Sequence, residues 1–197
     1  MEMSYDMDEL IKYYLYNETD YYINGGKAFN FYYPEDMIPT EDTDMIATES
    51  VCKRLFYNLN HILGKTISLT TGTEKIMVHS CRFQDTTYND ETPQGTVFRR
   101  VRSFLVNKIT VIDVTIVDSV DPYDIYKNID GTQYIAHDLF YNDLLETLQD
   151  RIQKTKLPTK KSKTRSRRKE KLSKTEQRVS IAEKYKNMDI KYVCSTI

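Results

Sequence analysis

Apolar residues recur at helical spacing in several parts of the chain. The clearest stripe runs from Thr48 to Leu63, and Gly64 follows where a helix commonly ends. Asp6, with Glu9 three residues later, resembles a capping box at the start of a short helix. We expect further helices over residues 27–33, after Asp138 and over residues 173–186. In the helix after Asp138 the predicted inward positions are Leu139, Leu144, Leu145, Leu148 and Ile152.

Runs of β-favouring residues lie between these helices. The predicted strands are residues 21–24, 42–46, 65–71, 75–82, 96–105 and 108–117, the last alternating and rich in Ile and Val. Thr71 to Glu74 is predicted to be a hairpin turn, and residues 86–95 a polar loop. The predicted fold class is therefore α+β (mixed α/β), a mixed sheet flanked by helices.

Charge is distributed unevenly along the chain. The segment from Arg151 to Arg178 holds 13 Lys and Arg against two Glu, a charge of +11, which leaves −12 for the rest of a chain of net charge −1. Residues 160–171 contain no apolar side chain, so we expect them to be mobile. A solvated tail and a nuclear-import patch both fit this composition, and so does a surface that binds nucleic-acid phosphates. We predict a domain over residues 1–153, a basic arm over 154–174 and a C-terminal helix and tail over 175–197.

The remaining composition excludes several classes of protein. No apolar run approaches the roughly 20 residues of a membrane helix, and the acidic N-terminus lacks the pattern of an export signal, so a cell interior is expected. The three cysteines, Cys52, Cys81 and Cys194, match no zinc spacing. We expect reduced thiols and no structural metal.

Two adjacent glycines, Gly25 and Gly26, stand between a predicted strand and a predicted helix. Glycine lets the backbone turn tightly and approach a phosphate, and the free N–H groups of a helix N-terminus favour anions. A Gly-Gly pair on its own is also common in ordinary turns. The pair is therefore a candidate phosphate-binding turn.

Three aspartates form the second candidate. Asp42 and Asp44 are two residues apart on a predicted strand, so their side chains share a face. Asp113 interrupts an apolar strand, which places it either at an exposed edge or beside the first pair. Three carboxylates could hold two cations and promote an in-line displacement. Asp118, five residues further, would face the other way, which favours Asp113 as the third ligand.

The order of these parts resembles the nucleotidyltransferase superfamily, in which a Gly-Gly turn precedes a D-x-D strand and a third Asp follows later. More narrowly, the segments Ile23–Asn30, Ile38–Asp44 and Asp130–Tyr134 resemble the catalytic poly(A) polymerases of large cytoplasmic DNA viruses. This resemblance covers roughly residues 20–185.

The resemblance implies a metal-dependent enzyme that adds nucleotides, AMP from ATP in the first instance, to an RNA 3′ end during mRNA processing. It implies that Gly25, Gly26, Lys27 and Asn30 bind the nucleotide, and that Asp42, Asp44 and Asp113 bind two Mg²⁺ or Mn²⁺ ions. The expected RNA-binding residues are Lys160, Lys161, Lys163, Arg165, Arg167, Arg168 and Lys169.

The expected location is the cytoplasm, in a viral factory or virion, although the basic segment also fits the nucleus. A second protein subunit is a further candidate partner. Two alternatives stay open: a small nucleotidyltransferase that modifies tRNA or protein, and an inactive RNA-binding or regulatory subunit. An RNA path over Arg99, Arg100 and Arg102 is the alternative to the basic arm.

Overall fold

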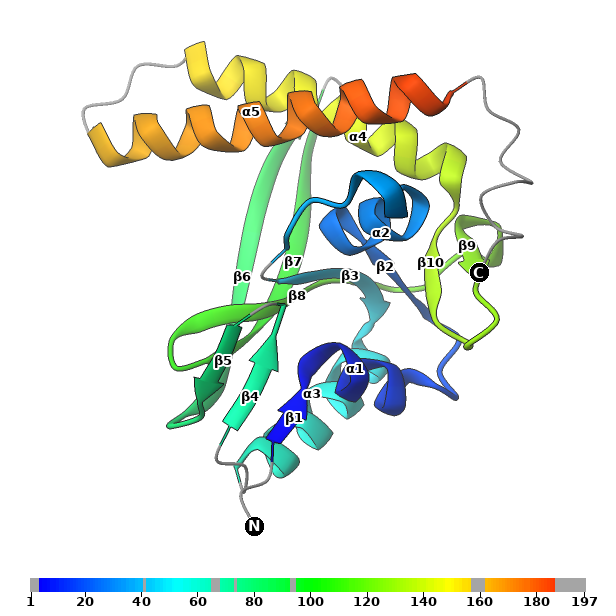
Figure 1. Ribbon diagram of the computed structural model, residues 1–197, viewed down its shortest axis with the longest axis vertical. Coiled ribbons are helices and arrows are strands. Elements are labelled where there is room, and N and C mark those ends of the chain that lie inside the picture. The colour runs from blue at the N-terminus through cyan, green and yellow to red at the C-terminus, as the bar shows by residue number, and fades with distance from the viewer. Residues whose placement is uncertain are drawn as a thin grey trace. The chain divides into compact units, whose positions relative to one another are not determined.

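A computed structural model describes residues 4–40, 42–64, 68–72, 74–92, 95–156 and 162–186 (Figure 1). The chain forms two compact units. The first combines the segment up to Ala28 with Ile38–Ile135, and the second combines Phe29–Met37 with the segment from Ala136 onward.

A mixed seven-stranded sheet dominates the described part of the first unit, in the order β6-β7-β8-β3-β2-β10-β9. Its strands are Cys81–Thr92 (β6), Gly95–Val106 (β7), Ile109–Val117 (β8), Thr43–Thr48 (β3), Tyr21–Asn24 (β2), Gln133–Ile135 (β10) and Ile125–Lys127 (β9). β3 is parallel to β8 and antiparallel to β2. Strands β1 (Ser4–Asp6), β4 (Ser68–Thr71) and β5 (Glu74–Met77) form a second, three-stranded sheet.

One face of the large sheet packs against helices α1 (Met7–Leu15) and α3 (Glu49–Leu63), which contact each other. β3 shows how the strand pattern produces this core, because Met45 and Ala47 are buried in it while Asp44 and Ile46 point to the opposite face. The predicted cap of α1 is confirmed, since the Asp6 carboxylate accepts hydrogen bonds from the backbone N–H groups of Asp8 and Glu9.

The second unit contains the rest of helix α2 (Gly25–Tyr32), the 3₁₀ turn η1 (Pro34–Asp36), and helices α4 (His137–Lys156) and α5 (Ser162–Tyr185). A further 3₁₀ turn, η2 (Pro122–Asp124), belongs to the first unit. No helix in the described ranges is long and apolar enough to cross a membrane.

The expected polar loop over residues 86–95 is wrong. β6 continues to Thr92 and pairs with β7, which begins at Gly95. Backbone hydrogen bonds between two antiparallel strands hold this ribbon together, and its exposed side chains need no apolar alternation. The segment therefore lacks the apolar alternation that identifies a strand in a sequence, although it forms one.

The single strand expected over residues 75–82 is also two strands. β5 ends at Met77, and β6 begins at Cys81 in the other sheet. Asn107 holds the backbone between them, because its side-chain oxygen accepts hydrogen bonds from the N–H groups of His79 and Ser80. A side chain distant in sequence thus fixes the break.

The helical segments of the second unit differ from expectation in phase and extent. Leu139 is 39% exposed rather than inward, because the buried face of α4 is set by Phe140 and Leu144, one turn apart. We expected residues 160–171 to be mobile. α5 begins at Ser162, so residues 162–171 are helical and the expectation is corrected for them. Residues 160 and 161 lie outside the described residues.

The basic half of α5 is stabilised by pairing with α4. The Arg151 guanidinium donates hydrogen bonds to the Lys171 carbonyl and to the Thr175 hydroxyl, and Thr175 is 1% exposed. Lys and Arg also favour helices intrinsically. Because α5 continues across residue 174, the domain boundary that we predict there falls inside a helix. The three-part division of the chain stays a prediction.

Candidate active site

The candidate site is a row of polar residues on one face of the large sheet. In the parallel pair β3–β8, Asp44 lies opposite Asp113. The row continues on both sides, since Asn24 of β2 lies opposite Asp44, and Ser103 of β7 lies opposite Asp113. Four adjacent strands thus contribute polar side chains at one level, on the face opposite the α1–α3 core.

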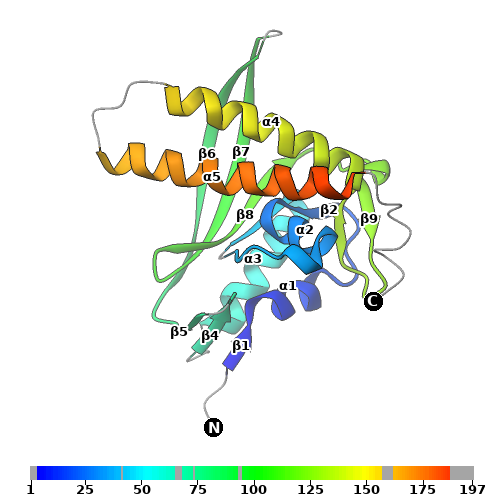
Figure 2. The same ribbon diagram turned by 45° about the horizontal axis from the view of Figure 1, so that its top comes forward.

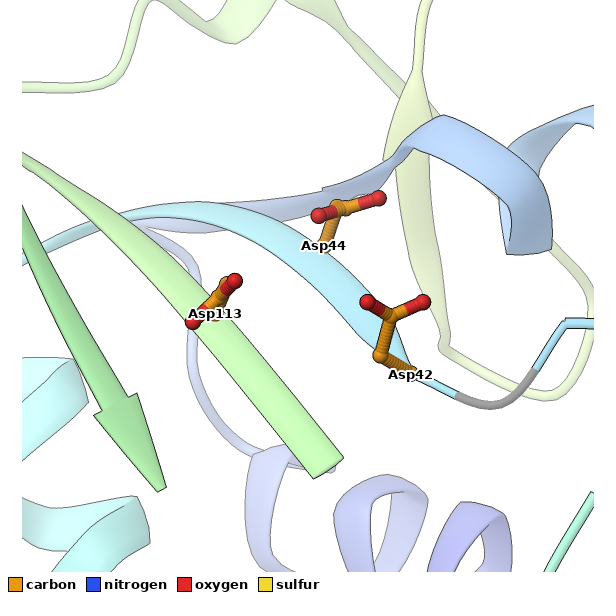
Figure 3. A group of neighbouring side chains, drawn as sticks. All are labelled: Asp42, Asp44 and Asp113. Carbon is orange, nitrogen blue, oxygen red and sulfur yellow. The ribbon is translucent and has the colours of Figure 1, made fainter. Parts of the chain in front are cut away.

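Asp42, in the bend before β3, joins Asp44 and Asp113 (Figure 3). One carboxylate oxygen of each residue lies within 4.8 Å of the other two. Mg²⁺–oxygen bonds of about 2.1 Å place oxygens on opposite sides of an ion about 4.2 Å apart. Small side-chain rotations would therefore bring all three oxygens into one coordination shell, and oxygen-only ligands suit Mg²⁺ or Mn²⁺. Asp44 and Asp113 are half-buried.

Ser103 is a candidate site residue that no pattern in the sequence indicates. Its hydroxyl donates a hydrogen bond to Oδ1 of Asp113. This bond orients the carboxylate, and the remaining lone pairs of its two oxygens stay available to a cation. Only the β7–β8 register, which places Ser103 opposite Asp113, identifies this residue, because no local motif in the sequence includes it.

We expect Ser103→Ala to weaken divalent-cation binding about 10-fold to 100-fold, the usual cost of losing a residue that orients a metal ligand. Titration with Mn²⁺, followed by calorimetry, measures this affinity directly. Ser103→Thr keeps the hydroxyl and serves as the matched control. Equal Mn²⁺ affinity in the Ala variant and the natural chain would show that the hydrogen bond does not position Asp113.

Gly25 joins β2 to α2 beside the aspartates. Its φ of +61° lies in the left-handed region, which favours glycine. A Cβ at this position would lie 2.2 Å from Oδ2 of Asp44, well inside van der Waals contact. Gly25 is thus required by the backbone and by the close approach of Asp44. Gly26, buried in the first turn of α2, lies at the helix N-terminus, where backbone N–H groups favour anions.

The other two expected nucleotide-binding residues are placed differently. Lys27 Nζ lies 2.5 Å from Oδ2 of Asp8 on α1, so this ammonium group already has an anionic partner. Asn30 lies one turn further along α2, in the segment that belongs to the other compact unit. Their roles in nucleotide binding stay predictions.

The basic residues of β7 project from both faces of the ribbon. Arg100 Nη2 lies 2.5 Å from Oε2 of Glu49, and Arg102 makes two hydrogen bonds with Asp85, of 2.6 and 2.8 Å. Hydrogen bonds from Lys53 and then Arg100 lower the pKa of Glu49 to about 2. Glu49 therefore stays ionised at neutral pH and neutralises charge on this part of the ribbon.

The expected RNA-binding residues lie mostly on α5. Arg165, Arg167 and Lys169 are exposed, and Arg168 is half-buried and donates a hydrogen bond to the Lys154 carbonyl. Lys163 lies in the first turn of α5, whereas Lys160 and Lys161 lie outside the described residues. None of these positions belongs to the compact unit that carries the aspartates.

Comparison with solved structures identifies the fold. The Megavirus polyadenylate synthase matches 95% of this chain with a TM-score of 0.59 and 12% sequence identity. Two structures of ANT(2")-Ia also align. The one in complex with adenylyl-2"-tobramycin has a TM-score of 0.42 and 12% identity, and the alignment covers 91% of this chain and 97% of that one. The other has a TM-score of 0.41 and 11% identity, and the alignment covers 94% of each chain. The chain spans 36% of the polyadenylate synthase.

The comparison confirms the resemblance found in the sequence at the level of the fold, which is of the nucleotidyltransferase type. The α+β class with a mixed sheet flanked by helices is confirmed as well. No protein-family model and no curated protein sequence matches the chain.

Proposed function

We propose that the chain is a divalent-cation-dependent nucleotidyltransferase that adds nucleotides to an RNA 3′ end, with ATP as donor. The observation that carries this proposal is the convergence of Asp42, Asp44 and Asp113 on one sheet face in a nucleotidyltransferase-type fold. Like charges at this separation repel, so a neutralising cation gives the arrangement a physical reason.

Each part of the site has a role in this reaction. The RNA 3′-oxygen attacks the α-phosphorus of the nucleoside triphosphate, a new P–O bond forms, and the bond to pyrophosphate breaks. A pair of Mg²⁺ or Mn²⁺ ions, when bound, lowers the pKa of the 3′-hydroxyl and neutralises charge on the pyrophosphate. Asp42 and Asp44 would hold both ions. Asp113 would hold one and accept the hydroxyl proton, while the backbone of Gly25 and Gly26 binds the triphosphate.

The purified chain, incubated with Mg²⁺ or Mn²⁺, a short RNA and each of the four labelled nucleoside triphosphates in turn, tests this proposal. Products are resolved by size. Extension of the RNA, greatest with ATP, is the expected result. Labelling of tRNA or protein in place of the short RNA would support a small nucleotidyltransferase of another acceptor class. RNA binding without any transfer would support an inactive RNA-binding subunit.

The basic residues of α5 and the segment before it are proposed to hold RNA through its phosphates, because a body of charge −12 would otherwise repel the acceptor. About four engaged cations give a salt slope near −3 for single-stranded RNA. We expect the slope to flatten, and affinity for all sequences to fall alike, when these residues are replaced by Gln: Lys160, Lys161, Lys163, Arg165, Arg167, Arg168 and Lys169.

Filter binding of labelled RNA at several salt concentrations measures that slope. Affinity for ATP serves as the internal control, because none of the proposed nucleotide-binding residues is replaced. An unchanged slope in the substituted protein would show that the basic segment does not contact RNA.

A further inference from the structure

The β6–β7 ribbon extends beyond the rest of the large sheet. β7 pairs with β8 only from Arg100 onward, where Arg100 lies opposite Ile116. From Arg99 back towards Gly95, β7 is paired with β6 alone. Figure 2 shows these two strands running beside each other as a long ribbon. In this part of the ribbon, Tyr88 of β6 and residues 96–100 of β7 are exposed to solvent.

Side-chain alternation places one pair of this ribbon on the same face as the aspartates. Ser103 lies opposite Asp113, and Val101 and Arg99 follow on that face at two-residue intervals. Val101 is buried, whereas Arg99 is exposed. Tyr88 of β6 lies directly opposite Arg99. The Arg99 Cζ atom is 5.2 Å from the centre of the Tyr88 ring, and Tyr88 is 46% exposed. Arg99 lies four positions before Ser103 along β7, a distance of about 13 Å.

The neighbouring arginines project from the opposite face. Arg100 and Arg102 share the face of Phe104, which belongs to the core, and their guanidinium groups contact Glu49 and Asp85. The expected RNA path over Arg99, Arg100 and Arg102 therefore does not follow one face, because Arg99 lies on the opposite face from the other two. Arg99 is the member that lies on the face of the aspartates.

We propose that Tyr88 and Arg99 bind the single-stranded RNA acceptor upstream of its 3′ end; this rests on the proposed function. The tyrosine ring provides a stacking platform for a base of any sequence, and the guanidinium group provides a cation for the phosphate or a stacked base. The ring therefore contributes affinity for a base, and the guanidinium group contributes affinity for the RNA backbone.

The arrangement of the sheet explains why this ligand is the acceptor rather than the nucleotide. Gly25 follows β2, on one side of the aspartates, whereas β7 lies on the other side. In an in-line displacement the attacking and leaving groups approach phosphorus from opposite directions. With the triphosphate on the Gly25 side, the 3′-hydroxyl approaches from the β7 side. The RNA upstream of that hydroxyl then continues along the ribbon.

Affinity for labelled oligo(A) and mixed-sequence single-stranded RNA, measured by fluorescence anisotropy at several salt concentrations, tests the proposal. We expect Tyr88→Ala to weaken binding about tenfold for both RNAs with little change in salt slope. Tyr88→Phe keeps the ring and should bind as the natural chain does. Arg99→Gln should lower the magnitude of the salt slope by about 0.7.

Arg100→Gln is the matched control, because it removes the same charge one residue away on the opposite face. It is expected to change RNA affinity less than Arg99→Gln does. Equal effects of the two substitutions, or unchanged affinity in both Tyr88→Ala and Arg99→Gln, would overturn the proposal. Circular dichroism of each variant confirms that the ribbon is folded.

A dinucleotide acceptor separates this proposal from the proposed function, because it is too short to reach from the aspartates to Tyr88. Its extension by the natural chain tests the transfer reaction alone. Tyr88→Ala should extend the dinucleotide at the natural rate while its KM for a long RNA rises about tenfold. Loss of dinucleotide extension in this variant would contradict an upstream binding role.

Discussion

Replacing Asp44 by Asn is expected to lower the rate of nucleotide transfer by about three orders of magnitude or more. Asparagine has nearly the same shape, so the close contact with Gly25 is kept. The negative charge is lost, and an NH₂ group, which cannot bind a cation, replaces one carboxylate oxygen. A loss of several kcal/mol of transition-state stabilisation corresponds to this range, since about 1.4 kcal/mol is tenfold in rate. Single-turnover transfer of labelled AMP to RNA measures it.

Asp118→Asn provides the matched control for charge. Asp118 is exposed, follows β8, and lies outside the carboxylate cluster among the residues that the structure describes. Its loss should leave transfer unchanged. Similar rates in the Asp44→Asn variant and the natural chain would show that the reaction takes place elsewhere, and thermal unfolding of both variants checks that the fold is intact.

Gly25→Ala is expected to reduce transfer nearly as much, although it adds only a methyl group. The left-handed backbone costs a non-glycine residue roughly 1–2 kcal/mol. The new Cβ would also lie 2.2 Å from Oδ2 and 3.0 Å from Cβ of Asp44, so the whole Asp44 side chain must move. Displacement of a metal ligand lowers both the rate of nucleotide transfer and the affinity for Mn²⁺. Calorimetric titration measures the loss of Mn²⁺ affinity.

Gly131→Ala isolates the backbone cost. Gly131 also has a left-handed backbone, with φ of +85°, but the nearest atoms to a Cβ there are in the Tyr16 ring at 3.6 Å, an ordinary contact. We expect Gly131→Ala to lose stability without losing Mn²⁺ affinity. The interpretation of Gly25 is contradicted if its Ala variant likewise loses only stability.

The candidate site could be predicted largely from the sequence because its main signals are local. Asp42 and Asp44 are spaced for one strand face, and a lone carboxylate in the apolar strand of Asp113 is a strong anomaly. Their convergence, however, depends on β3 pairing with β8 at a register that places Asp44 opposite Asp113. A shift of one residue would point Asp113 into the core. The sequence indicated this pairing without fixing its register.

The parts that were missed depend on contacts between distant residues. Ser103 has no motif and is recognised only across the β7–β8 ladder. Backbone hydrogen bonds hold the β6–β7 ribbon together, so β6 needs no apolar alternation that a sequence would reveal. Tyr88 and Arg99 meet only through the β6–β7 register. Likewise, helix α5 is stabilised by contacts with Arg151 of α4, so its basic composition alone suggested a mobile segment.

Anomalous X-ray scattering from a crystal of the chain with Mn²⁺ and a non-hydrolysable ATP analogue would locate the metal ions and the nucleotide together. We expect two manganese peaks about 3.5–4 Å apart, bound by the carboxylates of Asp42, Asp44 and Asp113, with the triphosphate against Gly25 and Gly26. Manganese bound elsewhere, or a nucleotide bound away from these carboxylates, would contradict this expectation.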